Sequence, residues 1–165
     1  KGFQLLSWII IAISLIAMVT LIIASLDNRK QEMTIYRANG ASPKFLAIVN
    51  EVREKISEVS VDQARERLKT GKHVALVDVR EDREWDKQHA CEAVHLGKGV
   101  LERDIENMFP DKSTELIMYC GGGYRSALTA EVAQRMGYKN IHSLAGGYKA
   151  LLEAEWPMNK PGTGK

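Results

Sequence analysis

The sequence predicts an α/β protein whose parallel sheet is flanked by helices and preceded by a single transmembrane helix. Beyond residue 50, apolar runs typical of strands alternate with helical segments, a pattern that favours parallel pairing with right-handed crossovers. One of these runs, 116–119, ends at a cysteine and a glycine-rich loop before the next helix. Nearer the amino end, Trp8–Leu26 form nineteen consecutive residues without a charge.

The amino-acid composition limits the classes of function that are expected for this protein. The 165 residues carry 23 basic and 21 acidic side chains, a balance that argues against a nucleic-acid-binding protein. Two cysteines far apart in sequence do not form a disulfide framework, so a reducing compartment is expected. No metal-binding spacing is present, and we expect no metal and no other cofactor. Because the chain starts at Lys1 rather than methionine, we expect a fragment of a longer protein.

Two parts are expected, residues 1–49 and residues 50–165. A helix over Trp8–Leu26 would be about 28 Å long, which matches the hydrocarbon thickness of a bilayer. A signal peptide would have a shorter apolar core, and a domain this small could hardly surround a buried core helix. Basic residues between positions 27 and 44 place the carboxyl side in the cytoplasm. The sequence thus predicts a single-pass protein of a bacterial-type inner (plasma) membrane, with the second domain facing the cytoplasm.

The segment that follows, 29–45, is basic and contains Arg29, Glu32, Arg37, Gly40, Ala41 and Ser42. With the preceding helix it resembles part of an FtsX-like permease of ABC transporters, over the first 49 residues. The resemblance implies a short cytoplasmic helix that couples to the transporter ATPase, and hence an ATPase or permease partner. The sequence departs from that family at Asn50, where polar residues replace a further membrane span. The alternative is an ordinary basic helix near anionic headgroups.

The second domain is expected to begin with a helix over 61–69, with Ser60 as its N-cap and Gly71 at its end. The remaining apolar runs predict strands at 73–79, 93–96, 116–119 and 140–144. The helical patterns predict helices at 80–87, 100–109 and 148–155, and one that follows the cysteine loop and ends at Met136. Pro157 and a Gly and Lys tail follow the last helix, and this tail is expected to be disordered. Three predicted strands end at Asp78, Cys120 and Leu144, and in a parallel sheet these ends should converge.

The loop after Cys120 favours one kind of chemistry. Gly121, Gly122 and Gly123 can adopt positive φ and carry no side chains, so their amides can turn inward around the sulfur. The first turn of the next helix adds its own amides and the positive end of its dipole. A free thiol titrates near pH ~8.5, and helix N-termini and adjacent cations lower that value. We therefore predict that Cys120 is a nucleophile; the alternative is a buried cysteine beside a glycine-rich turn.

The spacing between Cys120 and Arg125 discriminates between two reactions. Tyrosine phosphatases place five residues between these two, whereas only four separate them here. A shorter loop suits a single sulfur atom better than a phosphate. The run C-G-G-G-Y-R-S, up to Ser126, resembles the loop of single-domain rhodaneses, a family of sulfurtransferases.

Further segments carry the same resemblance, which covers about residues 57–157. The run D-V-R-E at 78–81, followed by Glu84 and Trp85, resembles the first signature of that family, and A-G-G-Y at 145–148 resembles its last loop. The segment 88–99 resembles the second signature, although Gln88 and Glu92 stand where that family has glycine, so the local turn is expected to be altered.

The resemblance implies a double displacement. The Cys120 thiolate would attack the sulfane sulfur of a small donor such as thiosulfate, release sulfite, and hold a persulfide that a thiol or cyanide acceptor then removes. The loop amides from Gly121 to Ser126 would stabilise the anionic sulfur. Tyr124 is expected at the pocket mouth or simply on the surface.

Other side chains are expected to support the loop. Arg125 either binds the sulfonate of thiosulfate or turns inward to pair with Asp78. Asp78 and Arg80 are interpreted as structural supports rather than proton carriers. His89 is expected to order the neighbouring turn, with catalysis as the other interpretation. Cys91 is either a resolving thiol or an inert small core residue.

The main hypothesis is a membrane-tethered sulfurtransferase. A second hypothesis is a non-catalytic interaction module associated with a transporter permease, in which the fold only docks a partner. A third is a cysteine-dependent phosphatase or arsenate reductase, which the length of the loop disfavours.

Overall fold

The computed structural model describes Trp8 and residues 10–25, 41–71 and 73–159. Contacts within the chain divide it into two units, residues 1–47 and residues 48–165.

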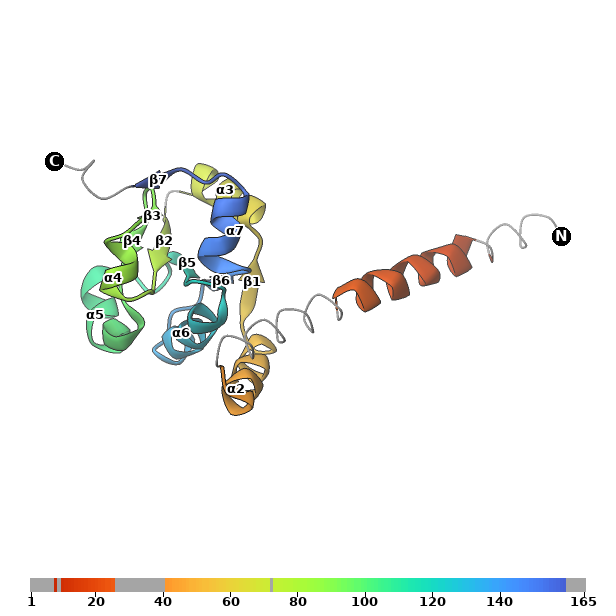
Figure 1. Ribbon diagram of the computed structural model, residues 1–165, viewed down its shortest axis with the longest axis horizontal. Helices are drawn as coiled ribbons and strands as arrows, with labels where there is room; N and C mark the ends of the chain where they lie inside the picture. The colour runs from red at the N-terminus through yellow and green to blue at the C-terminus, as the bar shows by residue number, and fades with distance from the viewer. Residues whose placement is uncertain (1–7, 9, 26–40, 72, 160–165) are drawn as a thin grey trace. The chain divides into compact units, whose positions relative to one another are not determined.

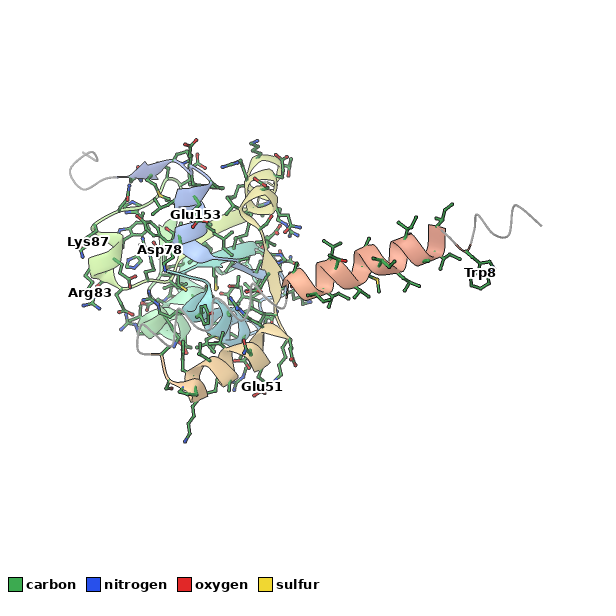
Figure 2. The ribbon with its side chains drawn as sticks, turned by 45° about the vertical axis from the view of Figure 1, so that its right-hand side comes forward. Trp8, Glu51, Asp78, Arg83, Lys87 and Glu153 are labelled. Atoms are coloured by element: carbon green, nitrogen blue, oxygen red, sulfur yellow. The ribbon has the colours of Figure 1, made fainter. Side chains whose placement is uncertain are left out.

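In the first unit, residues 10–25 form a helix, drawn in red in Figure 1. Its apolar side chains project from all sides and are exposed, as Figure 2 shows. Among the described residues, none of the helices combines the length and the apolar content needed to cross a membrane. The predicted membrane helix is therefore not found there; residues 9 and 26 of that prediction, and residues 29–40 of the basic segment, lie outside the described residues.

A five-stranded sheet forms the centre of the second unit, in the order β1-β6-β5-β2-β4 (Figure 1). Every neighbouring pair is parallel, so the predicted parallel sheet is confirmed. The strands are β1 (Ser57–Val59), β2 (Val74–Asp78), β4 (Val94–His95), β5 (Glu115–Tyr119) and β6 (Ile141–Leu144). Four of them lie where apolar runs predicted strands. The edge strand β1 was not predicted, because only one of its three residues is buried.

Helices cover both faces of this sheet. On one face α5 (Leu101–Met108) and α6 (Tyr124–Arg135) pack against side chains of β2, β5 and β6. On the other face lie α3 (Val61–Thr70) and α7 (Gly147–Glu153), as Figure 1 shows. Because strand side chains alternate, Met118 points to the first face and Tyr119 to the second. The remaining helical segments are α2 (Pro43–Arg53), α4 (Asp82–Trp85) and the 3-10 turn η1 (Lys98–Val100).

The predicted helix boundaries are confirmed closely for α3 and less well for α4. Ser60 caps α3, its hydroxyl accepting a hydrogen bond from the amide of Gln63 at 3.2 Å, and the helix ends at Gly71. The helix predicted over 80–87 forms only as the short α4. Arg80 does not join it because its side chain is buried and bound to Asp78.

A second, two-stranded sheet was missed. Here β3 (His89–Ala90) pairs antiparallel with β7 (Met158–Asn159). The Gly and Lys residues of the predicted tail, at 160–165, lie outside the described residues. Two-residue strands are too short to show a hydrophobic period. Glu92, in the turn after β3, has φ 66°, a left-handed conformation that favours glycine. The turn keeps a backbone suited to glycine although a glutamate occupies it.

Candidate active site

The three predicted strand ends converge at one edge of the sheet. In the register of the sheet, Asp78 lies beside Tyr119, and Met118 lies beside Ser143. Cys120 follows β5 directly, with β2 on one side of it and β6 on the other. The expectation drawn from parallel strands is confirmed, and Cys120 lies at the carboxyl edge where such sheets hold ligands.

Two hydroxyl groups lie behind the sulfur of Cys120. The Ser126 hydroxyl donates to Cys120 Sγ at 3.7 Å, and its oxygen lies 2.9 Å from Ser143 Oγ. All three residues are buried, Cys120 with 1% of its surface exposed. Ser126 was included in the predicted loop, but Ser143 was missed. A serine within the otherwise apolar end of β6 is the sequence feature that could have indicated it.

The amino end of α7 orients the peptide groups of the cysteine loop. The amide of Tyr148 donates to the carbonyl of Cys120 at 2.7 Å, and that of Lys149 donates to the carbonyl of Gly121 at 3.3 Å. The carbonyls are thus bound to α7. In the part of the chain that the structure describes, the amides of Gly121, Gly122 and Gly123 donate to no protein acceptor. They remain available to stabilise an anion at the loop.

Close packing between α7 and the loop depends on Gly147. Its φ is 56°, and a Cβ there would lie 2.3 Å from the carbonyl oxygen of Cys120, 2.8 Å from the amide nitrogen of Gly123 and 3.0 Å from that of Gly122. Real Cβ atoms essentially never approach backbone atoms so closely. The resemblance had matched this residue as part of A-G-G-Y without indicating its contact with the nucleophile loop.

Arg125 is held by two acidic residues of α4 and its N-cap. Its two terminal nitrogens donate to the two oxygens of Glu84, Nη1 to Oε2 at 2.7 Å and Nη2 to Oε1 at 2.9 Å. Glu81 Oε1 lies 3.8 Å from Nη1. The hydrogen bonds that Arg125 donates to Glu84 raise the pKa of Arg125 and lower the pKa of Glu84. Of the two alternatives for Arg125, the inward pairing with Asp78 is wrong, because Asp78 is bound by Arg80 instead.

Asp78 and Arg80 form a buried pair on the opposite face of the sheet from Cys120. Arg80 Nη2 donates to Asp78 Oδ2 at 2.6 Å, and the Arg80 amide donates to Oδ1 at 2.9 Å. Burial opposes the charge of Arg80, but the bonds to Asp78 outweigh it and raise the pKa of Arg80. The guanidinium lies 4.1 Å from the ring centroid of Tyr148, and Asp78 lies inside the domain in Figure 2. These contacts suit the predicted supporting role, because Tyr148 holds the cysteine loop.

His89 and Cys91 lie beside β7. The His89 ring stacks on Trp85, with centroids 3.5 Å apart, and His89 Nδ1 lies 3.0 Å from the carbonyl oxygen of Trp85. Cys91 is a free, half-buried thiol whose sulfur donates to Asn159 Oδ1 at 3.1 Å. The contacts of His89 are those of a residue that orders its turn. Cys91 is not a core residue, and it lines a pocket with Trp156 rather than with the cysteine loop.

Tyr124, the first residue of α6, is not at the surface. It is buried with 3% of its surface exposed, and the guanidinium of Arg53 lies 4.7 Å from its ring centroid. Of the two alternatives for Tyr124, the pocket mouth or the surface, exposure at the surface is therefore wrong. Gly123, just before it, has φ 87° and starts the helix with a left-handed turn.

Comparisons with known proteins agree with this geometry. The putative sulfurtransferase YtwF of Bacillus subtilis is 29% identical over 105 residues, which cover 64% of this chain and 99% of YtwF. The thiosulfate sulfurtransferase GlpE of Coxiella burnetii is 28% identical over 88 residues, which cover 53% of this chain and 76% of GlpE. Coverage varies among the curated relatives, since the chain spans 28% of the length of one and 99% of another.

A solved structure from Rhodopseudomonas palustris, described as a possible tyrosine phosphatase, matches with a TM-score of 0.64 and 29% identity, over 70% of this chain and 93% of that one. The family model described as a rhodanese-like domain matches residues 60–154, more than half of the 165 residues. This range contains four of the five strands of the parallel sheet, from β2 to β6, together with Cys120 and its glycine loop. The chain therefore belongs to the family of rhodanese-like domains.

Proposed function

We propose that the protein is a sulfurtransferase in which Cys120 carries a sulfane sulfur as a persulfide. The observation that carries the proposal is the environment of its sulfur. Cys120 lies at the carboxyl edge of the sheet, accepts a hydrogen bond from Ser126, and precedes three glycine amides that donate to no acceptor among the described residues. Such amides stabilise negative charge on a sulfur atom at the start of a helix.

The chemistry transfers a neutral sulfur atom in two displacements. The Cys120 thiolate attacks the outer sulfur of the donor; a bond forms between that sulfur and Sγ while the donor's own sulfur–sulfur bond breaks. The leaving group departs with the electron pair, as sulfite when the donor is thiosulfate. An acceptor thiolate or cyanide then attacks the bound sulfur, and Cys120 returns to a thiolate. Both resting forms are anionic, so the same amides support each of them.

The relatives support this chemistry over phosphate transfer. One curated relative is named a thiosulfate sulfurtransferase and another a putative sulfurtransferase. A solved structure is described as a possible tyrosine phosphatase, which makes that reaction the competing outcome. Only four residues separate Cys120 from Arg125, a loop that suits one sulfur atom better than a tetrahedral phosphate.

Turnover with thiosulfate, cyanide and an organic persulfide tests the proposal. We expect the Cys120→Ser variant to lose sulfur transfer entirely, whereas Cys91→Ser retains it. Mass spectrometry of the donor-treated wild type should find one added sulfur atom at Cys120. Equal rates in the wild type and Cys120→Ser would eliminate the proposal. Hydrolysis of p-nitrophenyl phosphate that depends on Cys120 would replace it with the phosphatase alternative.

We further propose that residues 8–26 attach this domain to the cytoplasmic side of a membrane. The support is a helix whose apolar side chains are exposed all round, in a stretch without a charged residue. In cells that express the full chain, the protein should stay with the membrane fraction after alkaline carbonate extraction. A Leu15→Glu and Val19→Glu double variant should be released. Release of the wild type under the same treatment would reject the attachment.

A further inference from the structure

The donors of Arg125 that would recognise a small anion are already used. Both of its terminal nitrogens point at the carboxylate of Glu84, at 2.7 and 2.9 Å, and Glu81 lies on the same side at 3.8 Å. A guanidinium binds a sulfonate or carboxylate through this same pair of parallel hydrogen bonds. A sulfonate would therefore have to displace Glu84 before it gained the same contact.

Glu84 also lies close to the loop that carries the nucleophile. A Cβ placed on Gly121 would be 3.9 Å from Glu84 Oε1 and 3.4 Å from Arg125 Nη2. The carboxylate is thus next to the residue that follows Cys120. The bond from Arg125 lowers the pKa of Glu84, so this carboxylate is ionised at neutral pH.

The depression beside the loop is acidic on balance. It is lined by three carboxylates and two guanidiniums, contributed by Glu81, Asp82, Arg83, Glu84 and Arg125. Glu84 and Arg125 neutralise each other, which leaves the carboxylates of Glu81 and Asp82 against Arg83, a residue that projects outward from α4 in Figure 2. Thiosulfate is a dianion and its leaving group, sulfite, is one too. A dianion bound in this depression would meet its surplus of carboxylates, and like charges repel.

We propose that this site selects organic persulfides that carry a cationic group beside the reacting sulfur–sulfur bond, and discriminates against thiosulfate and other anionic donors. The inference rests on the proposed sulfurtransferase function. The Cys120 thiolate attacks the outer sulfur of the persulfide; the sulfur–sulfur bond breaks, and the organic thiolate leaves with the electron pair and takes up a proton from water. No oxidant or reductant is consumed. The ammonium group of the donor lies against Glu84 and Glu81.

Four sulfur donors test the effect of donor charge on loading. Three are organic persulfides, of cysteamine (cationic), 2-mercaptoethanol (neutral) and 3-mercaptopropionate (anionic), and the fourth is thiosulfate. The rate of sulfur loading onto Cys120 is measured by intact-protein mass spectrometry in a Cys91→Ser background. Each rate is divided by the donor's reactivity with cyanide in the absence of protein. We expect the ammonium donor to load about tenfold faster than the carboxylate donor at low salt, and this ratio to shrink in high salt.

Glu84→Gln tests whether this carboxylate is the cause. The amide keeps the shape of the side chain and one acceptor for Arg125 but removes the charge. Loading by thiosulfate and by the carboxylate donor should rise about tenfold, while loading by the ammonium donor should fall. Glu106→Gln is the matched control, because Glu106 is also ion-paired, with Lys112 at 2.8 Å, but is not one of the residues that line the depression. This control should leave the donor ratios unchanged.

The outcomes separate the two proposals. Failure of every donor to load Cys120 would remove the sulfurtransferase function and the selectivity with it. Loading in which anionic donors match or exceed the cationic one would overturn the selectivity alone and leave the function standing. An equal change for all donors in Glu84→Gln would also overturn it, because Glu84 would then act only by bracing Arg125.

Discussion

A methyl group added at Gly147 should displace the backbone of the nucleophile loop, Cys120 to Gly123, which lies against it. In the wild type the amino end of α7 lies directly against that loop, and Tyr148 donates to the carbonyl of Cys120. The Gly147→Ala variant would place its Cβ 2.3 Å from that carbonyl oxygen and within 3.0 Å of the amide nitrogens of Gly122 and Gly123. All three contacts are backbone atoms, so no flexible side chain can move aside to relieve them.

Two contributions determine the magnitude of the effect. The φ of 56° at Gly147 lies in the left-handed region, which costs a residue with a Cβ about 1–2 kcal/mol. Overpacking against a fixed neighbour adds about 1–3 kcal/mol. The free energy of unfolding should therefore fall by about 2–5 kcal/mol, a large part of the ~5–15 kcal/mol that stabilises a typical domain.

The assay combines stability with function. Urea unfolding, followed by tryptophan fluorescence, gives the loss of stability, and sulfur loading of Cys120 is measured where both variants are fully folded. Because relief of the clash must move the loop, loading should slow at least tenfold even in the folded Gly147→Ala protein. Gly99→Ala is the matched control: a Cβ at Gly99 meets nothing within 4 Å, so its stability should change by less than ~1 kcal/mol.

The reasoning about this contact is refuted if Gly147→Ala and Gly99→Ala have the same unfolding free energy and the same loading rate. A loss of stability without slower loading would refute only the link between α7 and the nucleophile.

Two further substitutions test local claims. Removal of the hydroxyl in Ser143→Ala should slow alkylation of Cys120 by iodoacetamide about threefold to tenfold, because Ser126, 2.9 Å away, loses its hydrogen-bond partner; an alkylation rate equal to that of the wild type would argue against a role for this hydroxyl pair. Glu92→Gly should raise the free energy of unfolding by about 0.5–1 kcal/mol, since φ 66° suits glycine, and a lower urea midpoint would contradict the assigned turn.

The fold and the position of the nucleophile could be predicted because their signals are local. An apolar strand, three glycines and a helix follow one another around Cys120, and the alternation of such units predicts a parallel sheet. The capped helix α3 was predictable in the same way, because Ser60 and Gln63 lie within one turn. Short elements escaped this reasoning, since β3 and β7 have two residues each and become strands only by pairing across the domain.

Sequence by itself determined the order of the elements, the class of the fold and the cysteine at the end of β5, because backbone preferences and hydrophobic periods act between near neighbours. Only the tertiary structure determined which residues lie in contact around the cysteine loop. Arg125 binds Glu84 rather than Asp78, Ser143 approaches Ser126, and Gly147 packs against the loop. Each of these contacts joins residues that are 17 to 41 positions apart in the sequence. Whether two such residues lie close in space depends on how the whole domain packs.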